Sequence, residues 1–323
     1  MGDDSDPPSL ATFGETMLRY TPTGDDRLET SETFAVHVGG AESNVAVAAA
    51  RLGLGSAWLS RLPDTPLGRR IAATLRRHGV DPLVDWTDGG RVGTYYLEPG
   101  GKSRTASVTY DRAGTPVREA TPADLATEHI ARADAFHTTG ITPALAETLA
   151  ETTGELLALA GEHGTTRVFD VNYRGKLWSP AAARDTLSSL LDDVDLLVVA
   201  DRDAETVFDF DGEAASIARE FTSAYDIDRV IVTRGEAGAT ALFRDETFTQ
   251  SIFDSIDRYP VGTGDAFVGG FLASYLREES PERALSVAAA TAALKREIPG
   301  DLATVDPPDV ESLLDSSARD ISR

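Results

Sequence analysis

Short apolar runs alternate along this chain with longer stretches in which apolar residues recur every three or four positions. Short runs bounded by turn residues are typical of strands buried on both faces, and the longer periodicity is typical of the helices that cover them. This alternation predicts an α/β fold, a doubly wound and mostly parallel sheet. The predicted strands are 10–13, 57–60, 135–139, 167–171, 195–199 and 229–233, and the predicted helices are 43–52, 68–78, 143–163, 180–191, 214–224, 264–276, 281–295 and 308–314.

Four other segments lie outside this alternation. Segments 239–243 and 247–252 alternate polar and apolar residues and predict a hairpin. Segments 16–38 and 91–110 are rich in Gly, Pro and Thr, and together they predict a small antiparallel β-sheet that projects from the main domain as a lid. The main domain would then comprise 9–15, 39–90 and 111–323, and 1–8 would be a disordered, acidic, Pro-rich tail.

The charge and composition of the chain limit the kinds of protein and partner that it fits. The chain has 53 acidic and 30 basic residues, a net charge of −23, and only three of the basic residues are Lys (Lys102, Lys176 and Lys295). A net charge this large makes the chain repel itself, and this repulsion is screened only at high salt. We therefore expect a protein adapted to a salt-rich cytoplasm, with an ordinary acidic protein as the alternative. Nucleic acid is excluded as a partner by the same charge. The chain has no Cys and no apolar stretch of membrane-spanning length, so neither disulfides nor a membrane helix is expected.

The candidate chemistry is concentrated in Gly262–Phe267, which reads Gly-Thr-Gly-Asp-Ala-Phe. Glycines permit a tight turn, and the helix that follows presents free N–H groups and the positive end of its dipole, a site suited to a phosphate. Asp265 beside those amides could take a proton from a hydroxyl that attacks phosphorus, or it could only cap the helix. Gly101–Ser103 resembles the end of a P-loop, but Tyr96 stands where the first glycine of that motif belongs, so a hairpin tip is predicted there.

A second glycine motif lies near the N-terminus, where Val38–Ala48 reads Val-Gly-Gly-Ala-Glu-Ser-Asn-Val-Ala-Val-Ala. By itself this pattern indicates a closely packed helix start. The pairing of this motif with the later Gly-Thr-Gly-Asp resembles the ribokinase-like (PfkB) carbohydrate kinases over nearly the whole chain, from about residue 10 to 314.

The resemblance implies a ribokinase-like fold with a β-sheet lid and the transfer of a phosphoryl group from ATP, with Mg²⁺, to a sugar. It implies that Asp265 is the catalytic base and that the amides of Gly262, Thr263 and Gly264 form an anion hole. The sugar-binding positions that it implies are Gly39, Gly40, Asn44 and Asp265.

The segment Asp170–Arg174, at the end of a predicted strand, carries Asp, Asn, Tyr and Arg where α/β sheets bind ligands. It resembles 2-keto-3-deoxygluconate kinases, and fructokinases of the same family carry a related pattern. A keto-acid sugar needs a cation for its carboxylate, and Arg is suited to bind one bidentately. The resemblance gives Arg112 and Arg174 this role and places Tyr95 and Tyr110 of the predicted lid against the sugar.

The predicted nucleotide-binding residues follow two other strands. They are Asp203, Thr233, Arg234, Gly235 and Gly238, together with Gly262 and Gly264. The family's Asn-x-x-Glu motif lacks its Asn here, so the Mg²⁺ ligands are left open, and Asp203 replaces the Glu. Several members bind a monovalent cation through an Asp where this chain has Tyr259, so a need for such a cation is left open too.

The sequence thus predicts a cytoplasmic, ATP-dependent kinase that phosphorylates 2-keto-3-deoxygluconate, and also its galactonate epimer, at the primary hydroxyl. A neutral-sugar kinase such as a fructokinase is the first alternative. A non-catalytic nucleotide- or sugar-binding regulator is the second. Because the predicted lid sheet exposes an edge and a face, a homo-oligomer, either a dimer through the lid or larger, is expected.

Overall fold

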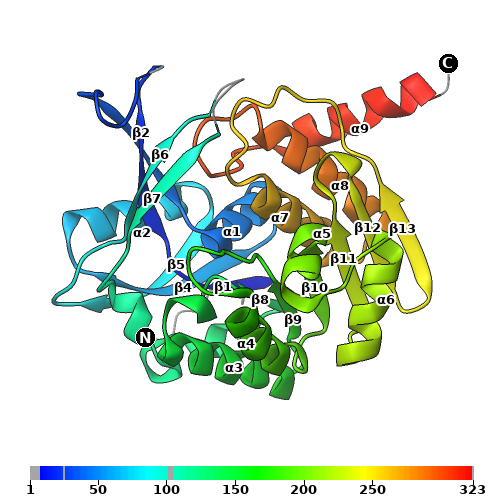
Figure 1. Cartoon of the computed structure of the whole chain (residues 1–323), viewed down its shortest axis with the longest axis horizontal. Coiled ribbons are helices and arrows are strands. Elements are labelled where there is room, and N and C mark those ends of the chain that lie inside the picture. Colours follow the sequence, from blue (N-terminus) through cyan, green and yellow to red (C-terminus); the bar gives the residue numbers. More distant parts are fainter. Residues whose placement is uncertain (1–7, 25, 101–104, 322–323) are drawn as a thin grey trace.

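The computed structural model describes residues 8–24, 26–100 and 105–321, and it places a nine-stranded sheet at the centre of the molecule (Figure 1). The strand order is β13-β12-β11-β10-β9-β8-β1-β4-β5; the seven strands from β11 to β5 run parallel, whereas β12 and β13 are antiparallel additions. The strands are β1 (Leu10–Phe13), β4 (Ser56–Pro63), β5 (Val80–Thr87), β8 (Ala135–Thr139), β9 (Thr166–Asp170), β10 (Leu196–Ala200), β11 (Arg229–Thr233), β12 (Ala239–Phe243) and β13 (Glu246–Gln250).

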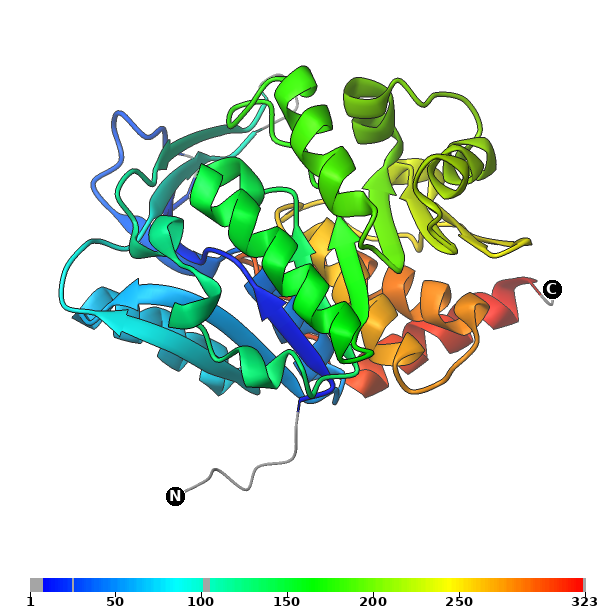
Figure 2. The same cartoon turned by 90° about the horizontal axis from the view of Figure 1, so that it is seen from below.

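Helices cover both faces of this sheet, as Figure 2 shows from below. Three of them begin at a hydroxyl cap followed by Pro: Thr65, Ser179 and Ser280 each accept a hydrogen bond from the backbone three residues on, which fixes where α2, α4 and α8 start. The main helices are α1 (Ala41–Arg51), α2 (Pro66–Arg77), α3 (Glu147–Glu162), α4 (Pro180–Leu191), α6 (Ala214–Tyr225), α7 (Thr263–Tyr275), α8 (Pro281–Lys295) and α9 (Pro307–Ile321).

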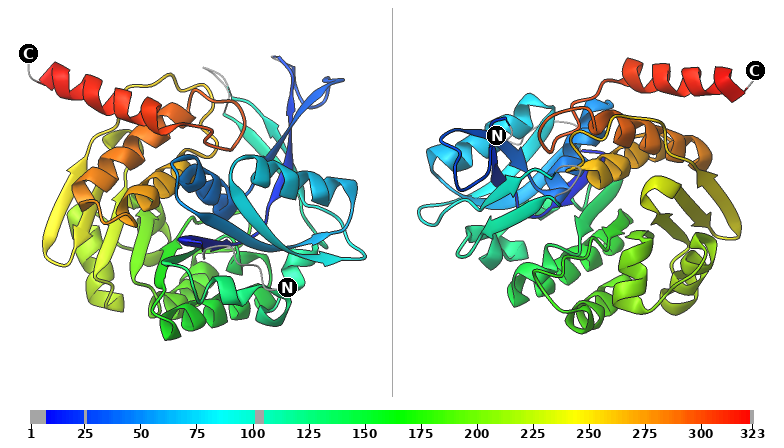
Figure 3. Two further views of the ribbon diagram at one scale, coloured as in Figure 1. Left: turned by 180° about the vertical axis from the view of Figure 1, so that it is seen from behind. Right: turned by 45° about the horizontal axis from the view of Figure 1, so that its top comes forward.

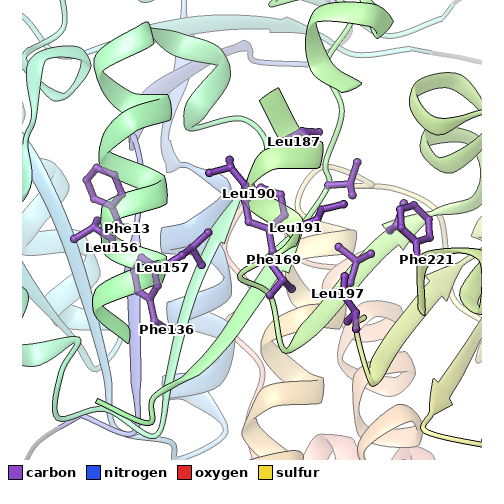
Figure 4. Close-up of a cluster of buried hydrophobic side chains, with 14 of the residues drawn as sticks. Phe13, Phe136, Leu156, Leu157, Phe169, Leu187, Leu190, Leu191, Leu197 and Phe221 are labelled. Carbon is purple, nitrogen blue, oxygen red and sulfur yellow. The ribbon is translucent and has the colours of Figure 1, made fainter. Parts of the chain in front are cut away.

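The core is divided by the sheet into layers. Under α3, α4 and α6, large side chains such as Phe136, Phe169 and Leu197 are completely buried (Figure 4). On the opposite face, α1, α7 and α8 pack through Ala, Val and Phe271, whereas α9 lies along the outer side of this layer (Figure 3). Burial of this apolar surface is the main source of stability for the fold.

A second sheet of four strands stands apart from the first, in the order β3-β2-β6-β7. Its strands are β2 (Met17–Pro22), β3 (Phe34–Gly39), β6 (Thr94–Glu98) and β7 (Ser107–Asp111). Two distant segments therefore combine, as predicted. The prediction of an antiparallel sheet was wrong at one pairing: β2 and β6 are parallel, with Leu18 opposite Thr94, because both strands enter from the same edge of the main sheet.

Several predicted boundaries differ from the structure. The predicted helix 143–163 begins only at α3, because Pro143–Leu145 form a 3-10 turn and Ala146 is extended. β5 was not predicted, since its mixed polar sequence lies at the sheet edge, and β13 ends two residues earlier than expected. A one-turn π-helix, Ala204–Phe208, was also missed. Residues 1–7 of the predicted tail and the predicted hairpin tip at 101–103 lie outside the described residues.

Candidate active site

A pocket of about 680 Å³ opens where β1, β8, β9 and β10 end, between the main sheet and the small sheet. The connections from β1 and β8 leave in opposite directions along the sheet here, and such a reversal leaves a crevice at the strand ends. All of the predicted sugar-binding and catalytic residues line it: Gly39, Gly40, Asn44, Tyr95, Tyr110, Arg112, Arg174, Gly262, Thr263, Gly264 and Asp265.

Asp265 lies in the first turn of α7 and faces α1 across the pocket. Its Oδ2 accepts a hydrogen bond of 2.7 Å from Nδ2 of Asn44, and Oδ1 of Asn44 accepts one of 3.3 Å from the backbone N–H of Gly40. The two glycine motifs are thus joined by one chain of hydrogen bonds. Burial raises the pKa of Asp265 to about 6, although Asn44 and Arg174 lower it.

Gly262 is the residue before α7, and its backbone requires glycine. Its φ is +85°, and an added Cβ would lie 2.2 Å from the carbonyl oxygen of Asp301. This close approach holds the turn at the pocket, which Gly264 and Asp265 line at the start of α7 with their backbone amides not paired within the described chain, whereas the amide of Thr263 donates to the carbonyl of Pro260 at 3.2 Å. Free amides at a helix start bind an anion, so the arrangement suits a phosphate group.

Two further carboxyl groups, those of Glu42 and Asp170, lie near Asp265. Oε1 of Glu42 accepts hydrogen bonds from the hydroxyls of Thr139, at 2.8 Å, and Thr142, at 2.7 Å, and burial raises its pKa to about 7. Burial, with the charges of Asp265 and Asp203, raises the pKa of Asp170 to about 8. The pocket floor therefore favours a cation or proton donors over further negative charge.

The two predicted carboxylate-binding arginines lie in different environments. Arg112 is mostly buried, with Nε 2.7 Å from Oε2 of Glu15, and its guanidinium lies 5.4 Å from the ring centroid of Tyr110. Arg174, in the loop after β9, is exposed to the pocket and forms no ion pair within the described ranges. Its positive charge opposes the rise in pKa that burial causes at Asp170, Asp203 and Asp265. Arg174 is thus the available cation, whereas the charge of Arg112 is balanced by Glu15.

Tyr95 lines the pocket, but its hydroxyl donates to Oδ1 of Asp301 rather than facing a ligand freely. Asp301 is buried and also lies 3.0 Å from Nη1 of Arg19, on β2. The small sheet is therefore joined to the loop that packs on Gly262 by a buried ion pair and a hydrogen bond. Tyr110 beside it is half exposed, with its ring 5.8 Å from that of Tyr95.

A second pocket of about 550 Å³ lies on the other side of the α7 N-terminus. It brings together Thr233, Arg234, Gly235, Gly238 and Gly264 of the predicted nucleotide site, and Phe253 and Ala292 add an apolar wall. Nη2 of Arg234 donates to the carbonyl of Ala237 at 2.9 Å, within its own turn. Asp203 lines the first pocket instead, where Oδ2 accepts from the backbone N–H of Tyr173 at 3.2 Å.

Sequence reasoning missed four residues of this site: Glu15, Arg19, Glu42 and Asp301. All are buried charged groups whose partners lie far away in sequence, so no local motif marks them. Glu42 alone had a signal, because it lies inside the first glycine motif. In the described part of the chain, no three His, Cys, Asp or Glu side chains converge as a metal cluster, and no helix has the length and apolarity to span a bilayer.

Comparison with known proteins gives matches along nearly the whole chain. Residues 7–306 match the pfkB family carbohydrate kinase model. A Haloferax volcanii protein named 2-dehydro-3-deoxygalactonokinase is 51% identical over 314 residues, covering 97% of this chain and 99% of that protein. A 2-dehydro-3-deoxygluconokinase of Thermoproteus tenax is 31% identical, with 95% and 94% covered. The crystal structure of 2-dehydro-3-deoxygluconokinase from Thermotoga maritima has 32% identity and a TM-score of 0.85, with 94% and 97% covered.

Proposed function

Since the chain belongs to the pfkB family of carbohydrate kinases, we propose that it phosphorylates 2-keto-3-deoxygalactonate at its primary hydroxyl, using ATP. The gluconate epimer, which the sequence favoured, is the alternative substrate. The 51% identical relative is named for the galactonate and relatives near 30% for the gluconate, so similarity supports the galacto epimer. The two epimers share the carboxylate and the reacting hydroxyl.

The acid-sugar assignment is supported mainly by Arg174, whose guanidinium is not paired with a carboxylate in the described part of the chain. It faces the same pocket as Asp265 and forms no ion pair with another described residue. A guanidinium in this position offers a planar pair of N–H donors that matches a carboxylate. A neutral sugar would leave this cation unused, beside a floor whose carboxyl groups already have raised pKa values.

Asp265 is positioned to take the proton from the sugar hydroxyl as it attacks the γ-phosphorus. Asn44 holds one carboxylate oxygen, and the pKa of about 6 leaves the group mostly ionised at neutral pH while keeping it a useful base. The amides at the start of α7 would stabilise the charge on the transferring phosphoryl group. The second pocket, on the other side of this helix start, would hold the nucleotide.

Mg²⁺ is the metal that the family implies, and the residues fit it. Mg²⁺ typically keeps several waters and binds through one or two carboxylates and the phosphates of its substrate. Asp170 and Asp203 line the first pocket near the α7 N-terminus and supply such carboxylates. When bound, the ion would neutralise charge on the nucleotide phosphates. A dedicated cluster of protein ligands is not needed for this role.

The test measures ATP consumption at molar KCl with 2-keto-3-deoxygalactonate, 2-keto-3-deoxygluconate, fructose and ribose in parallel. The proposal expects turnover with the acid sugars and the galactonate as the better substrate by kcat/KM. Turnover with only neutral sugars would discard the Arg174 site, and ATP binding without any turnover would favour the regulator. A higher kcat/KM for the gluconate than for the galactonate would change only the epimer that we assign and would leave the acid-sugar assignment in place.

Arg174→Ala tests the carboxylate contact within the same panel. Removing a charge-assisted pair should raise KM for the acid sugars by about 10- to 100-fold, equivalent to about 1.5–3 kcal/mol. Arg174→Lys keeps the charge without the planar fork and should fall between the two. An equal loss with fructose would show that Arg174 does not recognise the carboxylate.

A further inference from the structure

Lys295, the last residue of α8, is a completely buried lysine close to the catalytic turn. Its Nζ donates to three backbone carbonyl oxygens: to Ile298 at 3.0 Å, to Gly300 at 3.1 Å and to Tyr259 at 3.4 Å. An ammonium group has three donors, so every donor of this side chain is used. The cost of burying the charge is offset by this complete set of partners.

The three carbonyls belong to two loops that hold the catalytic turn from both sides. Tyr259 precedes Pro260, whose carbonyl accepts from the hydroxyl of Thr263 at 2.8 Å, at the start of α7. Gly300 precedes Asp301, whose carbonyl packs against Gly262 so closely that a Cβ would lie 2.2 Å away. One ammonium therefore joins the backbone on both sides of the amides that face the phosphate.

The choice of lysine here is informative because this chain otherwise avoids it. Of 30 basic residues 27 are Arg, so a retained Lys indicates a position that a guanidinium cannot fill. A guanidinium is planar, whereas an ammonium is a compact point charge that fits inside a cage of carbonyl oxygens. Burial lowers the pKa of Lys295 to about 8, while Asp301 and Asp265 oppose this, so the group stays mostly charged at neutral pH.

A cage of backbone carbonyls is also what an alkali cation uses. The family resemblance implied, for several members, a monovalent cation bound through an Asp where this chain has Tyr259, and that cation does not fit here. Tyr259 supplies no carboxylate, its carbonyl already faces Lys295, and the neighbouring Asp257 pairs with Arg296 at 3.1 Å.

We propose that Lys295 is a positioning residue that serves as a built-in monovalent cation, so that the catalytic turn is held without a bound alkali ion. This proposal rests on the kinase activity but not on which sugar is the substrate. A lysine that orders the phosphate-binding amides differs in its test from one that only stabilises the fold. Removal of the ordering lysine should create a site that a free cation can fill.

The first experiment uses the unmodified protein in KCl, NaCl and choline chloride at equal, molar ionic strength. We expect the same kcat within about twofold, and the same unfolding midpoint in KCl as in NaCl. Saturable activation by K⁺ over Na⁺ and choline would overturn the proposal without any variant. The thermal measurement needs no sugar, so it remains decisive if the substrate assignment fails.

The second experiment uses Lys295→Met, which keeps the length of the side chain and removes the charge. We expect kcat to fall at least tenfold in choline chloride and to recover at least threefold, saturably, when K⁺ or NH₄⁺ replaces choline. The unfolding midpoint should rise with the same two cations, which a variant lacking only fold stability would not show.

Arg283→Met is the matched control, because it removes a surface cation from the same helix that pairs with Glu311 and lies outside both pockets. It should respond to salt identity as the unmodified protein does. A Lys295→Met protein whose kcat and midpoint are indifferent to K⁺ and NH₄⁺ would overturn the proposal. So would one whose response equals that of Arg283→Met. If Lys295→Met does not fold, the measurement on the unmodified protein decides.

Discussion

Replacement of Asp265 by Asn separates the chemical role of this carboxylate from its structural one. The amide is nearly isosteric, and its oxygen can accept the 2.7 Å hydrogen bond from Asn44, so the pocket should keep its shape. The variant loses only the ability to accept a proton. Loss of a positioned base costs about 10²- to 10⁴-fold in turnover, and we expect kcat to fall within that range.

The same substitution should stabilise the fold, because burial raises the pKa of Asp265 to about 6. A carboxyl group whose folded pKa lies above its unfolded value of about 3.9 stabilises the fold at low pH. That contribution is lost as the pH rises through 6. At pH 7.5 the ionised group is therefore a cost, which the amide removes. Since the side chain is partly exposed, we discount the shift and expect a gain of about 1 kcal/mol.

The assay is coupled ATP turnover from pH 5 to 8 together with thermal unfolding of both proteins. In the unmodified protein kcat/KM should fall about tenfold per pH unit below 6, and the residual activity of Asp265→Asn should lack this limb. Asp309→Asn, in the first turn of α9 and outside both pockets, is the matched control. Near-normal kcat in a folded Asp265→Asn protein would refute the assignment of the base.

Three other predictions concern the backbone, the small sheet and the charge. Gly262→Ala should lower the free energy of unfolding by about 2 kcal/mol or more, because Ala is strained at φ +85°. Gly264→Ala, whose Cβ would meet nothing within 4 Å, is the control and should not lower it. Equal unfolding midpoints of the two variants would contradict the strain at Gly262. Tyr95→Phe should cost about 1–3 kcal/mol in urea unfolding by leaving buried Asp301 short of a donor, and Tyr110→Phe, at a half-exposed ring, should cost almost nothing. Raising KCl from 0.1 to 1 M should raise the unfolding midpoint, since a net charge of −23 is then screened over about 3 Å; a flat or falling midpoint would argue against salt adaptation.

The parallel strands and their covering helices were predictable because both are periodic. β1, β8 and β11 have the predicted bounds, and the caps and prolines set the starts of α4 and α8. β5 was not predictable in this way, because Asp81, Pro82 and Asp85 interrupt its apolar pattern at a sheet edge that water reaches. Periodicity describes burial, so an element that is only half buried has a weak pattern.

The candidate site was predictable only where its chemistry is local. The motif around Asp265 and the glycine pair at Gly39 place the pocket, since each is read within a few residues. The pairing of Arg112 with Glu15 joins residues 97 apart, and no local pattern could show that this cation is already balanced. Lys295 stood out only as one of three lysines, and its place in the site could not be predicted, because its partners are backbone carbonyls, which every residue carries.

The small sheet has a consequence for the order in which the protein folds and is synthesised. Its parallel pairing brings Leu18 beside Thr94, and the hydrogen bond from Tyr95 to Asp301 joins residues 206 apart. Contacts between distant residues form late, because the intervening chain must first become compact. During refolding, helical circular dichroism should therefore return before sugar binding does. On the ribosome, the first pocket is incomplete until residue 301 has emerged, so nearly the whole chain must be made before a ligand of that pocket can stabilise it.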